Sequence, residues 1–274
     1  IIGQPAGKAE LIVLVDNQFN YQRCPLHLEY FDWYHFGGIT RPVELHRLGT
    51  HWINAVHMIT EDTATRRVFL SIDYSMEAPE LIPLVICCND QIISEEIVSL
   101  HAAHGTLQRT LELPGTELWS PQTPNLYLLK VMLGEDDLIV RIGIRQIRVQ
   151  DRQILINEQP IRLLGFNRHE SHPQFGHALT DALLVSDVQQ LRDMGCNFVR
   201  GSHYPQDPRF LDLCDESGIC VWNEGIGWQH IEEHLTDSHF IDAQVTHLTE
   251  MVDMAFNHPS VIKYAAPNES ESQK

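Results

Sequence analysis

The sequence predicts a protein of two unlike parts, an all-β part followed by an α/β part. Up to about residue 143, short apolar runs alternate with Gly, Pro, Asn and Asp, and no convincing helical period intervenes. This spacing is typical of the strands of a β-sandwich. From about residue 154, strand-like runs alternate with amphipathic helical segments, which predicts βα units on a parallel sheet.

The predicted elements of both parts are bounded by residues that end strands or helices. In the first part, strands are predicted at residues 9–17, 41–49, 66–75, 80–89, 126–134 and 138–149. In the second part, strands are predicted at 160–167, 197–203, 219–224 and 260–269, and helices at 180–196, 207–218 and 242–259. Thr180 and Asp181 mark a helix start, Gly195 and Gly218 mark helix ends, and Pro259 follows the last helix.

The length of the second part indicates half of a barrel. A (β/α)8 barrel takes about 250 residues, so the stretch from Ile161 to Lys274 fits about four of its eight strands. An open four-stranded α/β domain is the alternative. It would leave its last strand ending in a Glu near the chain terminus with no covering helix, so we predict the first half of a barrel.

Composition and charge disfavour several classes of partner. The chain has 19 Lys and Arg against 37 Asp and Glu, a formal net charge of -18, which repels phosphate backbones and anionic lipid headgroups. No apolar run reaches the roughly 18 residues of a membrane span. The start has neither an initiator Met nor a signal-peptide layout. We therefore expect an internal segment of a longer protein, with no nucleic-acid or membrane partner.

The six cysteines show no metal-binding spacing such as C-x-x-C. Several lie in apolar runs, so buried free thiols are expected, which favours a reducing compartment such as the cytoplasm.

Polar side chains follow each of the four predicted parallel strands. The carboxyl ends of such strands line the functional face of a barrel or a doubly wound sheet. They carry Asn167, Arg168, His169 and Glu170; Arg200, Ser202, His203 and Tyr204; Asn223 and Glu224; and Asn268 and Glu269. Any one of these could be a solvated loop residue or a structural histidine. Four consecutive strands that deliver such groups to one rim indicate a functional site.

Several segments resemble glycoside hydrolase family 2, the β-galactosidase and β-glucuronidase family. Those similar to its catalytic barrel are LLGFNRHESHPQFG, CNFVRGSHYPQDPRFLDLCDESGICVWNE and NHPSVIKYAAPNES. Those similar to its jelly-roll and immunoglobulin-like domains are DWYHFGGITRPVEL, LWSPQTPNLYLL and VRIGIRQIRV. The resemblance implies a jelly-roll tail at residues 1–47, an immunoglobulin-like sandwich at 48–150 and the first half of a TIM barrel at 151–274.

The resemblance also implies a retaining mechanism with two glutamates about 5 Å apart, an acid/base after strand four and a nucleophile at strand seven. Glu269 matches the acid/base, and Asn268 matches the residue that hydrogen-bonds the sugar 2-hydroxyl. No carboxylate here occupies a strand-seven position, so the chain alone is expected to be inactive. Asn223 and Glu224 repeat the same dipeptide on strand three and are expected to have supporting or loop roles.

Four further residues match substrate-site positions of the family. Arg200 resembles the arginine that orients the nucleophile, and His169 and His203 resemble sugar-contacting histidines. Asp32 resembles a jelly-roll aspartate that holds sugar hydroxyls, with a turn or capping Asp as its alternative.

The resemblance implies no required cofactor, and a magnesium site is not favoured. Trp228 stands near where some family members carry a magnesium-binding Glu, and His230 alone is a poor site for an ion that prefers oxygen ligands. Trp222 and Trp228 could form a platform for sugar stacking, with core packing as the alternative.

The function implied is hydrolysis of terminal β-D-glycosides. A β-galactoside leads and a β-glucuronide comes next, because VWNEGIGWQH resembles some β-galactosidases. A non-catalytic carbohydrate-binding or structural fragment of the same architecture is the alternative. Assembly into a homo-oligomer is compatible with either.

Overall fold

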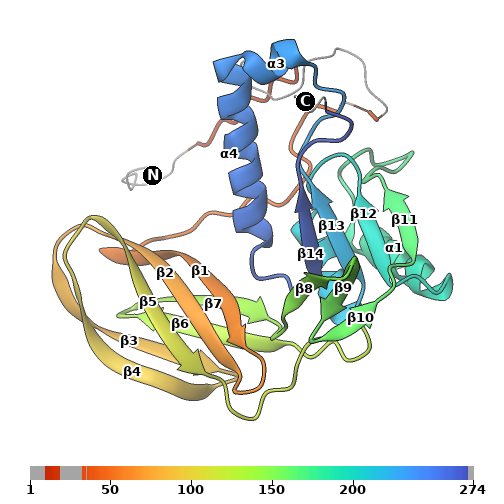
Figure 1. The fold of residues 1–274 in the computed structure, drawn as a ribbon. Helices are drawn as coiled ribbons and strands as arrows, with labels where there is room; N and C mark the ends of the chain where they lie inside the picture. The colour runs from red at the N-terminus through yellow and green to blue at the C-terminus, as the bar shows by residue number, and fades with distance from the viewer. Residues whose placement is uncertain (1–9, 19–32, 35, 271–274) are drawn as a thin grey trace.

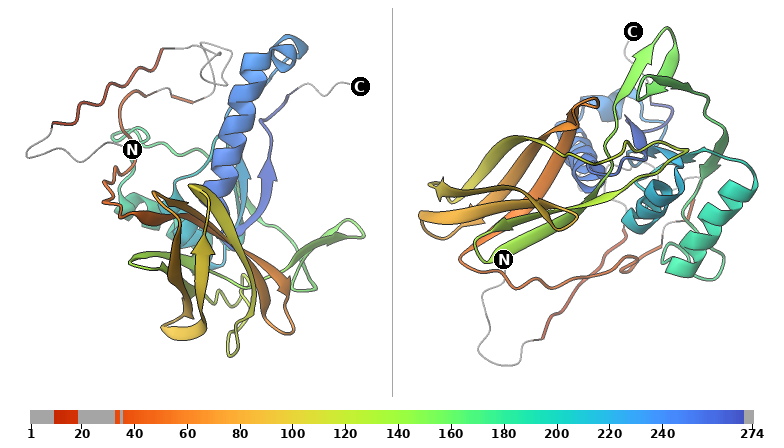
Figure 2. Two further views of the ribbon diagram at one scale, coloured as in Figure 1. Left: turned by 90° about the vertical axis from the view of Figure 1, so that its left-hand side faces the viewer. Right: turned by 90° about the horizontal axis from the view of Figure 1, so that it is seen from below.

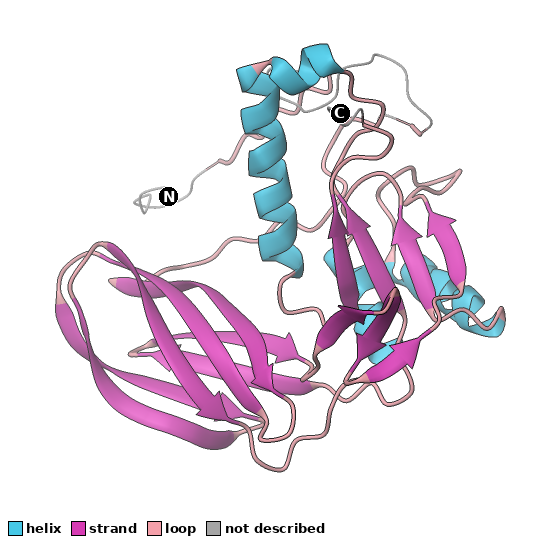
Figure 3. Cartoon of the chain, viewed as in Figure 1, coloured by secondary structure: helices cyan, strands magenta, loops and turns pink. Residues whose placement is uncertain are grey.

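The computed structural model of the protein describes residues 10–18, 33–34 and 36–270 (Figure 1). A β-sandwich comes first along the chain, and an α/β body follows it, with a small three-stranded sheet between them (Figure 3). Within the described residues, helices occur only in the α/β body. The change from strands alone to strands and helices is therefore as the sequence predicts.

Two antiparallel sheets form the sandwich, with strand orders β1-β2-β5 and β4-β3-β6-β7. The strands are His51–Asp62 (β1), Arg67–Met76 (β2), Glu80–Cys88 (β3), Gln91–Leu100 (β4), His104–Glu112 (β5), Tyr127–Leu133 (β6) and Asp136–Ile142 (β7). Alternate residues are buried, so that Leu70 and Ile72 of one sheet share a core with Leu84 and Ile86 of the other. Because every second residue is buried, one face of each sheet packs against this core.

A small sheet of order β10-β9-β8 connects the two bodies. Its strands are Ile147–Gln150 (β8), Gln153–Ile156 (β9) and Gln159–Ile161 (β10). Each of its hairpins turns through two residues with positive φ, Asp151 and Arg152 in one and Asn157 and Glu158 in the other. Two consecutive residues of positive φ suit the twist of a tight hairpin, which explains why such short strands pair.

The α/β body is built on a parallel sheet whose strands follow their sequence order, β11-β12-β13-β14. The strands are Gly165–Arg168 (β11), Phe198–Gly201 (β12), Cys220–Glu224 (β13) and Val261–Ala265 (β14). The helices are Asp181–Asp193 (α1), Pro208–Ser217 (α2), Glu232–Thr236 (α3) and Ser238–Ala255 (α4). Within the described residues, none of these helices is long and apolar enough to cross a lipid bilayer.

The helices of the α/β body cover the sheet with an apolar core. Leu184 of α1, Phe210 of α2 and Ala255 of α4 pack with Val199 and Val221 of the sheet. Figure 2 shows α1 and α2 together beside the sheet. At the ends of α2, the Asp207 side chain accepts a hydrogen bond from the backbone N–H of Arg209, and Gly218 has a φ of 68°. This helix therefore has a polar cap at its start, and it ends at Gly218, as the sequence predicts.

Some predicted strands are wrong. Residues 10–17 and 41–49 form no strand, although Leu11, Ile12 and Leu14 make an apolar run. A strand needs a neighbour for its backbone N–H and C=O groups, and no described residue pairs with these segments. The jelly-roll assignment for residues 1–47 therefore stays a prediction, as does the immunoglobulin-like type of the sandwich.

Other elements were missed or merged by the sequence patterns. The predicted strand at 138–149 is two strands, β7 and β8, which belong to different sheets. The predicted strand at 160–167 is likewise divided between β10 and β11. Strands β1, β4, β5 and β9 and the short helix α3 were not predicted. In β4 and β5, polar residues such as Ser94, Glu95 and Glu96 dilute the apolar signal on which strand prediction depends.

Candidate active site

The carboxyl ends of the four parallel strands lie at one end of the sheet, where the arrowheads of β11 to β14 all point in Figure 1. Arg200 lies on β12, and His203 follows that strand. Glu224 is the last residue of β13, and Asn268 and Glu269 follow β14. Hydrogen bonds join the side chains of Arg200, His203, Glu224 and Asn268 into one cluster, and Glu269 follows Asn268 in the chain. Residues that are far apart in the sequence therefore meet at this rim.

Arg200 connects the ends of β12, β13 and β14. Its Nε and Nη2 atoms lie 2.9 and 2.7 Å from Oε2 of Glu224. The same Nη2 donates to Oδ1 of Asn268 at 2.8 Å. Because a guanidinium is planar, these contacts fix its orientation. The structure thus brings together two residues that the sequence assigns to substrate binding.

The two histidines assigned to sugar contacts lie side by side. The ring centroids of His169 and His203 are 5.5 Å apart. Trp33 packs near both, at 6.0 Å from His169 and 5.8 Å from His203, and it is 5.0 Å from Trp228. Trp33 was missed by the sequence analysis. It follows Asp32 directly in an aromatic run, and that position is the signal that could have identified it.

Glu269 lies on a loop that pairs with the loop that follows β13. Asn268 accepts a backbone hydrogen bond from Gln229 at 2.9 Å and donates one to Gly227 at 3.2 Å. The side-chain amide of Gln229 donates to Oε2 of Glu269 at 3.0 Å. Glu269 is exposed and has a φ of 50°. Its carboxyl group is therefore held at a fixed backbone position and remains accessible to a ligand.

Arg168 and Glu170, which were also predicted at this rim, serve a buried ion-pair network instead. Glu170 is 3% exposed. Its Oε1 lies 3.2 Å from Arg41 and its Oε2 lies 3.2 Å from Arg168, which in turn pairs with Asp187 at 2.7 Å. Buried charges are tolerated when they are paired in this way. The network fastens the segment around Arg41 to the end of β11, next to the candidate site.

Tyr204 belongs to the same network. Its Oη accepts a hydrogen bond from the backbone N–H of Glu170 at 2.8 Å. Burial raises the pKa of Tyr204 to about 12, so the phenol is neutral at physiological pH. Tyr204 is therefore a neutral partner in the network and not an acid or base for chemistry near pH 7.

The remaining assigned residues fall into three groups. Asp32 lies outside the described residues. Asn223 is fully buried and its Oδ1 accepts a hydrogen bond from the backbone N–H of Gln206 at 3.3 Å, and its expected supporting role stays a prediction. Trp228 is 5% exposed and packs on Trp33. Nζ of Lys263 lies over the Trp222 ring, 3.7 Å from its centroid. Packing therefore accounts for Trp228 better than an open stacking platform does.

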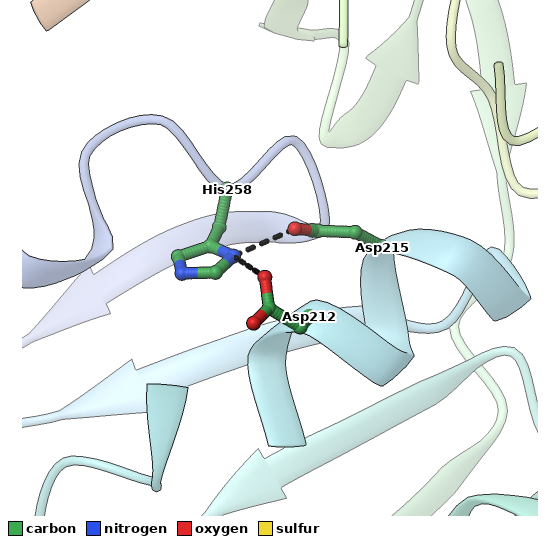
Figure 4. Close-up of side chains that lie close together, drawn as sticks. All are labelled: Asp212, Asp215 and His258. Atoms are coloured by element: carbon green, nitrogen blue, oxygen red, sulfur yellow. Dashed lines mark hydrogen bonds and ion pairs between the residues drawn. The ribbon is translucent and has the colours of Figure 1, made fainter. Parts of the chain in front are cut away.

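A group that could ligate a metal ion lies at the other end of the sheet. Asp212, Asp215 and His258 bring one ligand atom each within 4.8 Å of one another (Figure 4). Protein partners already engage these atoms. Arg141 lies 2.6 Å from Oδ1 of Asp212, and Nδ1 of His258 lies 2.6 Å from Oδ2 of Asp215. Because a cationic side chain occupies the place of a cation, ion pairing explains this cluster without a metal.

The chain is similar to known proteins over most of its length. Residues 147–274 match the model of the glycosyl hydrolases family 2 TIM barrel domain. A β-galactosidase of Vibrio vulnificus (strain CMCP6) is 31% identical over 267 residues, 89% of this chain. The chain belongs to glycosyl hydrolase family 2. It spans only 26% of the Vibrio protein, about a quarter of the length of that curated relative.

Solved structures of this family show the same fold. A family 2 β-galacturonidase from Eisenbergiella tayi, solved with bound galacturonate, superposes with a TM-score of 0.88 at 32% identity, over 94% of this chain and 47% of that one. A β-D-glucuronidase from Dictyoglomus thermophilum gives a TM-score of 0.71 at 29% identity, over 88% of this chain and 42% of that one. The proteins to which this chain is similar are thus named for more than one sugar.

Proposed function

We propose that this chain carries the acid/base half of the active site of a retaining β-glycosidase. The observation that supports the proposal best is the convergence of Arg200, His203, Asn268 and Glu269 at the carboxyl ends of parallel strands in a family 2 barrel domain. Barrel enzymes build their active sites at this face. Glu269 is the accessible carboxyl group of the cluster, as a group that exchanges protons with substrate must be.

In this mechanism Glu269 first donates its proton to the glycosidic oxygen while a second carboxylate attacks the anomeric carbon. The bond to the leaving group breaks and a glycosyl-enzyme ester forms. Glu269, now ionised, then removes a proton from water, which attacks the anomeric carbon and releases the sugar and the nucleophile. The Asn268 amide nitrogen suits a hydrogen bond to the 2-hydroxyl, because Arg200 already engages its Oδ1.

The nucleophile comes from a part of the barrel outside the four described strands. Of the described residues, Glu224 is the other carboxylate in the cluster, but it is 1% exposed and both its oxygens have protein donors. It cannot approach an anomeric carbon without breaking those bonds. Since the chain spans about a quarter of the Vibrio relative, the remaining barrel strands of such an enzyme would supply the missing group.

We propose a β-galactoside as the substrate, with β-glucuronides and β-galacturonides as the alternatives. Relatives named β-galactosidase and a β-galacturonidase structure both match this chain at 31–32% identity. Galactose and galacturonic acid share the axial 4-hydroxyl and differ at C6, where the acid carries a carboxylate. The best-supported part of the substrate proposal is therefore a sugar with the axial 4-hydroxyl of galactose. We further propose that Asp32, beside Trp33, holds sugar hydroxyls.

An assay with aryl glycosides tests this function in the polypeptide that carries this chain and a complete barrel. The p-nitrophenyl β-D-galactoside should be hydrolysed faster than the β-D-glucuronide or the β-D-galacturonide. Glu269→Gln should lower kcat on a phenyl galactoside by roughly two to four powers of ten, and have less effect on glycosylation by a dinitrophenyl galactoside, whose leaving group needs little protonation. Asp32→Ala should raise KM with the fold intact.

Two outcomes would contradict the proposal. A folded protein that cleaves none of the three glycosides would exclude this activity. Equal losses on both leaving groups in the Glu269→Gln variant, measured as pre-steady-state glycosylation rates, would exclude Glu269 as the acid.

A further inference from the structure

Glu224 is a buried carboxylate in contact with two residues of the proposed substrate site. It is 1% exposed. Oε2 accepts hydrogen bonds from Nε and Nη2 of Arg200 at 2.9 and 2.7 Å, and Oε1 lies 2.6 Å from Nδ1 of His203. Taking a carboxylate out of water is costly, and apolar side chains of similar size often stabilise a fold as well or better. Stability alone therefore does not explain the buried charge of Glu224, whereas a role in the site does.

We propose that Glu224 is a positioning residue, which sets the tautomer of His203 and aims the guanidinium of Arg200. The inference rests on the proposed glycosidase function. An ionised carboxylate can only accept hydrogen bonds, so the proton of the His203 ring is on Nδ1. The single negative charge of Glu224 is already matched by Arg200, so a neutral imidazole suffices. Its Nε2 is then an acceptor, suited to a sugar hydroxyl that donates.

The free atoms of both partners fit this role. The described part of the chain supplies no hydrogen bond to Nε2 of His203. Its Nδ1 lies 2.6 Å from Oε1 of Glu224 and 3.4 Å from Nη2 of Arg200; the longer contact is no hydrogen bond when Nδ1 carries the proton, because both nitrogens are then donors. On Arg200, Nε and Nη2 are engaged by Glu224 and Asn268, and Nη1 has no partner within the described residues. Glu224 therefore leaves one nitrogen on each side chain for groups that the four described strands do not provide.

The chain contains a matched control for Glu224. Asp215 is also 1% exposed and also lies 2.6 Å from Nδ1 of a histidine, His258. It accepts a further hydrogen bond from the backbone N–H of Ser260 at 2.9 Å. Asp215 lies on α2 and contacts His258, which stands just before β14 (Figure 4). This contact lies near the amino end of β14, whereas the candidate site lies at the carboxyl ends of the strands. Loss of either carboxylate should lower stability, whereas only Glu224 should affect the site.

The first test is nuclear magnetic resonance of the polypeptide with a complete barrel, labelled with ¹⁵N at its histidines, and it does not depend on activity. The side-chain ¹⁵N signals of His203 at pH 7.5 should show a protonated Nδ1 and an unprotonated Nε2. Glu224→Gln should abolish that pattern, and Asp215→Asn should leave it unchanged. A wild-type His203 with its proton on Nε2, or a pattern that survives Glu224→Gln, would overturn the proposal.

The second test is kinetic, in the polypeptide with a complete barrel. Glu224→Gln should lower kcat/KM for the aryl galactoside by roughly 10- to 100-fold, and Glu224→Asp, which keeps the charge, should recover part of the loss. Asp215→Asn should change kcat/KM by less than about threefold in folded protein. If Glu224→Gln does not fold, Glu224→Asp carries the test, and unchanged kcat/KM in a folded Glu224 variant would refute the role.

The two tests separate this inference from the proposed function. A wild-type enzyme that cleaves no glycoside would reject the function, while the His203 signals would still show whether Glu224 sets the tautomer. An active wild type with the wrong tautomer would reject only the role of Glu224.

Discussion

Burial sets the ionisation of several single residues in this chain. It raises the pKa of the Cys214 thiol well above its usual range and that of Cys220 to about 12. Both thiols are fully buried, and Cys87 and Cys88 are nearly so. Because the thiolate is the reactive form, these cysteines should stay inert in the folded protein. The prediction of free, buried thiols therefore holds for these four residues, and Cys24 lies outside the described residues.

His247 on α4 allows a prediction about acid stability. Burial lowers its pKa below the usual 6.5, partly offset by the Glu250 carboxylate, and its Nε2 has no hydrogen-bond partner in the described structure. The unfolded chain therefore binds a proton at this residue more readily than the folded one. Stability is complete above about pH 6.5 and falls as the pH drops through the folded pKa.

Replacing His247 with Gln should reduce this acid dependence. The difference in the free energy of unfolding between pH 7.5 and pH 5, measured with urea, should be smaller in the variant than in the wild type. His239→Gln is the control, because His239 lies on the same helix and is exposed. A His247 variant with the wild-type pH dependence would show that this ring does not contribute.

At the scale of single elements, β11 depends on the absence of a side chain at Gly165. Gly165 pairs with Phe198 of β12, and a Cβ on Gly165 would lie 1.7 Å from the backbone carbonyl oxygen of Phe198. A backbone oxygen cannot move as a flexible side chain can. Gly165→Ala should therefore push β11 away from β12, with a cost of about 1–3 kcal/mol typical of overpacking.

Thermal unfolding of the Gly165→Ala variant checks this prediction. The transition of the α/β body should move to lower temperature. Gly49→Ala is the matched control, because its nearest atom would be 3.7 Å away, at ordinary contact distance. Equal melting temperatures for both variants and the wild type would mean that the strands separate without cost.

The sequence predicted the elements of the α/β body better than those of the sandwich. Helices such as α2 have local sequence signals at their ends, here Asp207, Pro208 and Gly218. The parallel strands are short apolar runs between such helices. Strands β4 and β5 consist mostly of exposed and half-buried residues. Pairing with neighbouring strands therefore determines that they are strands more than their own composition does. For the same reason, the apolar run at residues 10–17 looked like a strand and is not one.

The positions of the candidate residues at the strand ends were predictable as a set, but their contacts were not. Strand ends supplied Arg200, His203, Asn268 and Glu269, because the carboxyl ends of parallel strands share one rim. Which of these residues face the site and which form buried ion pairs depends on burial and distance. The spacing of residues along the sequence does not encode either. Glu170 looks as polar as Glu269 in the sequence, yet it is 3% exposed and is paired with Arg41 and Arg168.

At the scale of the whole molecule, the sandwich supports the α/β body from the end away from the candidate site. Arg145 donates to the backbone oxygens of Pro259 and Val261 at 2.8 and 3.0 Å, and Nε1 of Trp119 donates to that of Asp215 at 2.9 Å. These contacts lie around the amino ends of the parallel strands, where residues serve stability in barrel proteins. The candidate site lies at the opposite, carboxyl ends of these strands.

The last prediction follows from the order of the parallel sheet. Strand β14 is at its edge, and no described strand pairs with the backbone donors and acceptors on its outer side. We expect the 274-residue chain, expressed alone, to show no glycosidase activity above background, because loss of an essential nucleophile costs several powers of ten in rate. We also expect the α/β body to dimerise or aggregate through this edge while the sandwich, which has its own core, stays folded.

The test is to assay the purified chain and its Glu269→Gln variant on aryl β-galactoside and β-galacturonide, and to measure the size of the chain by light scattering. Hydrolysis that Glu269→Gln abolishes would mean that a second carboxylate within these residues acts as the nucleophile, and Glu224, the buried neighbour of Arg200, would be the first residue to re-examine.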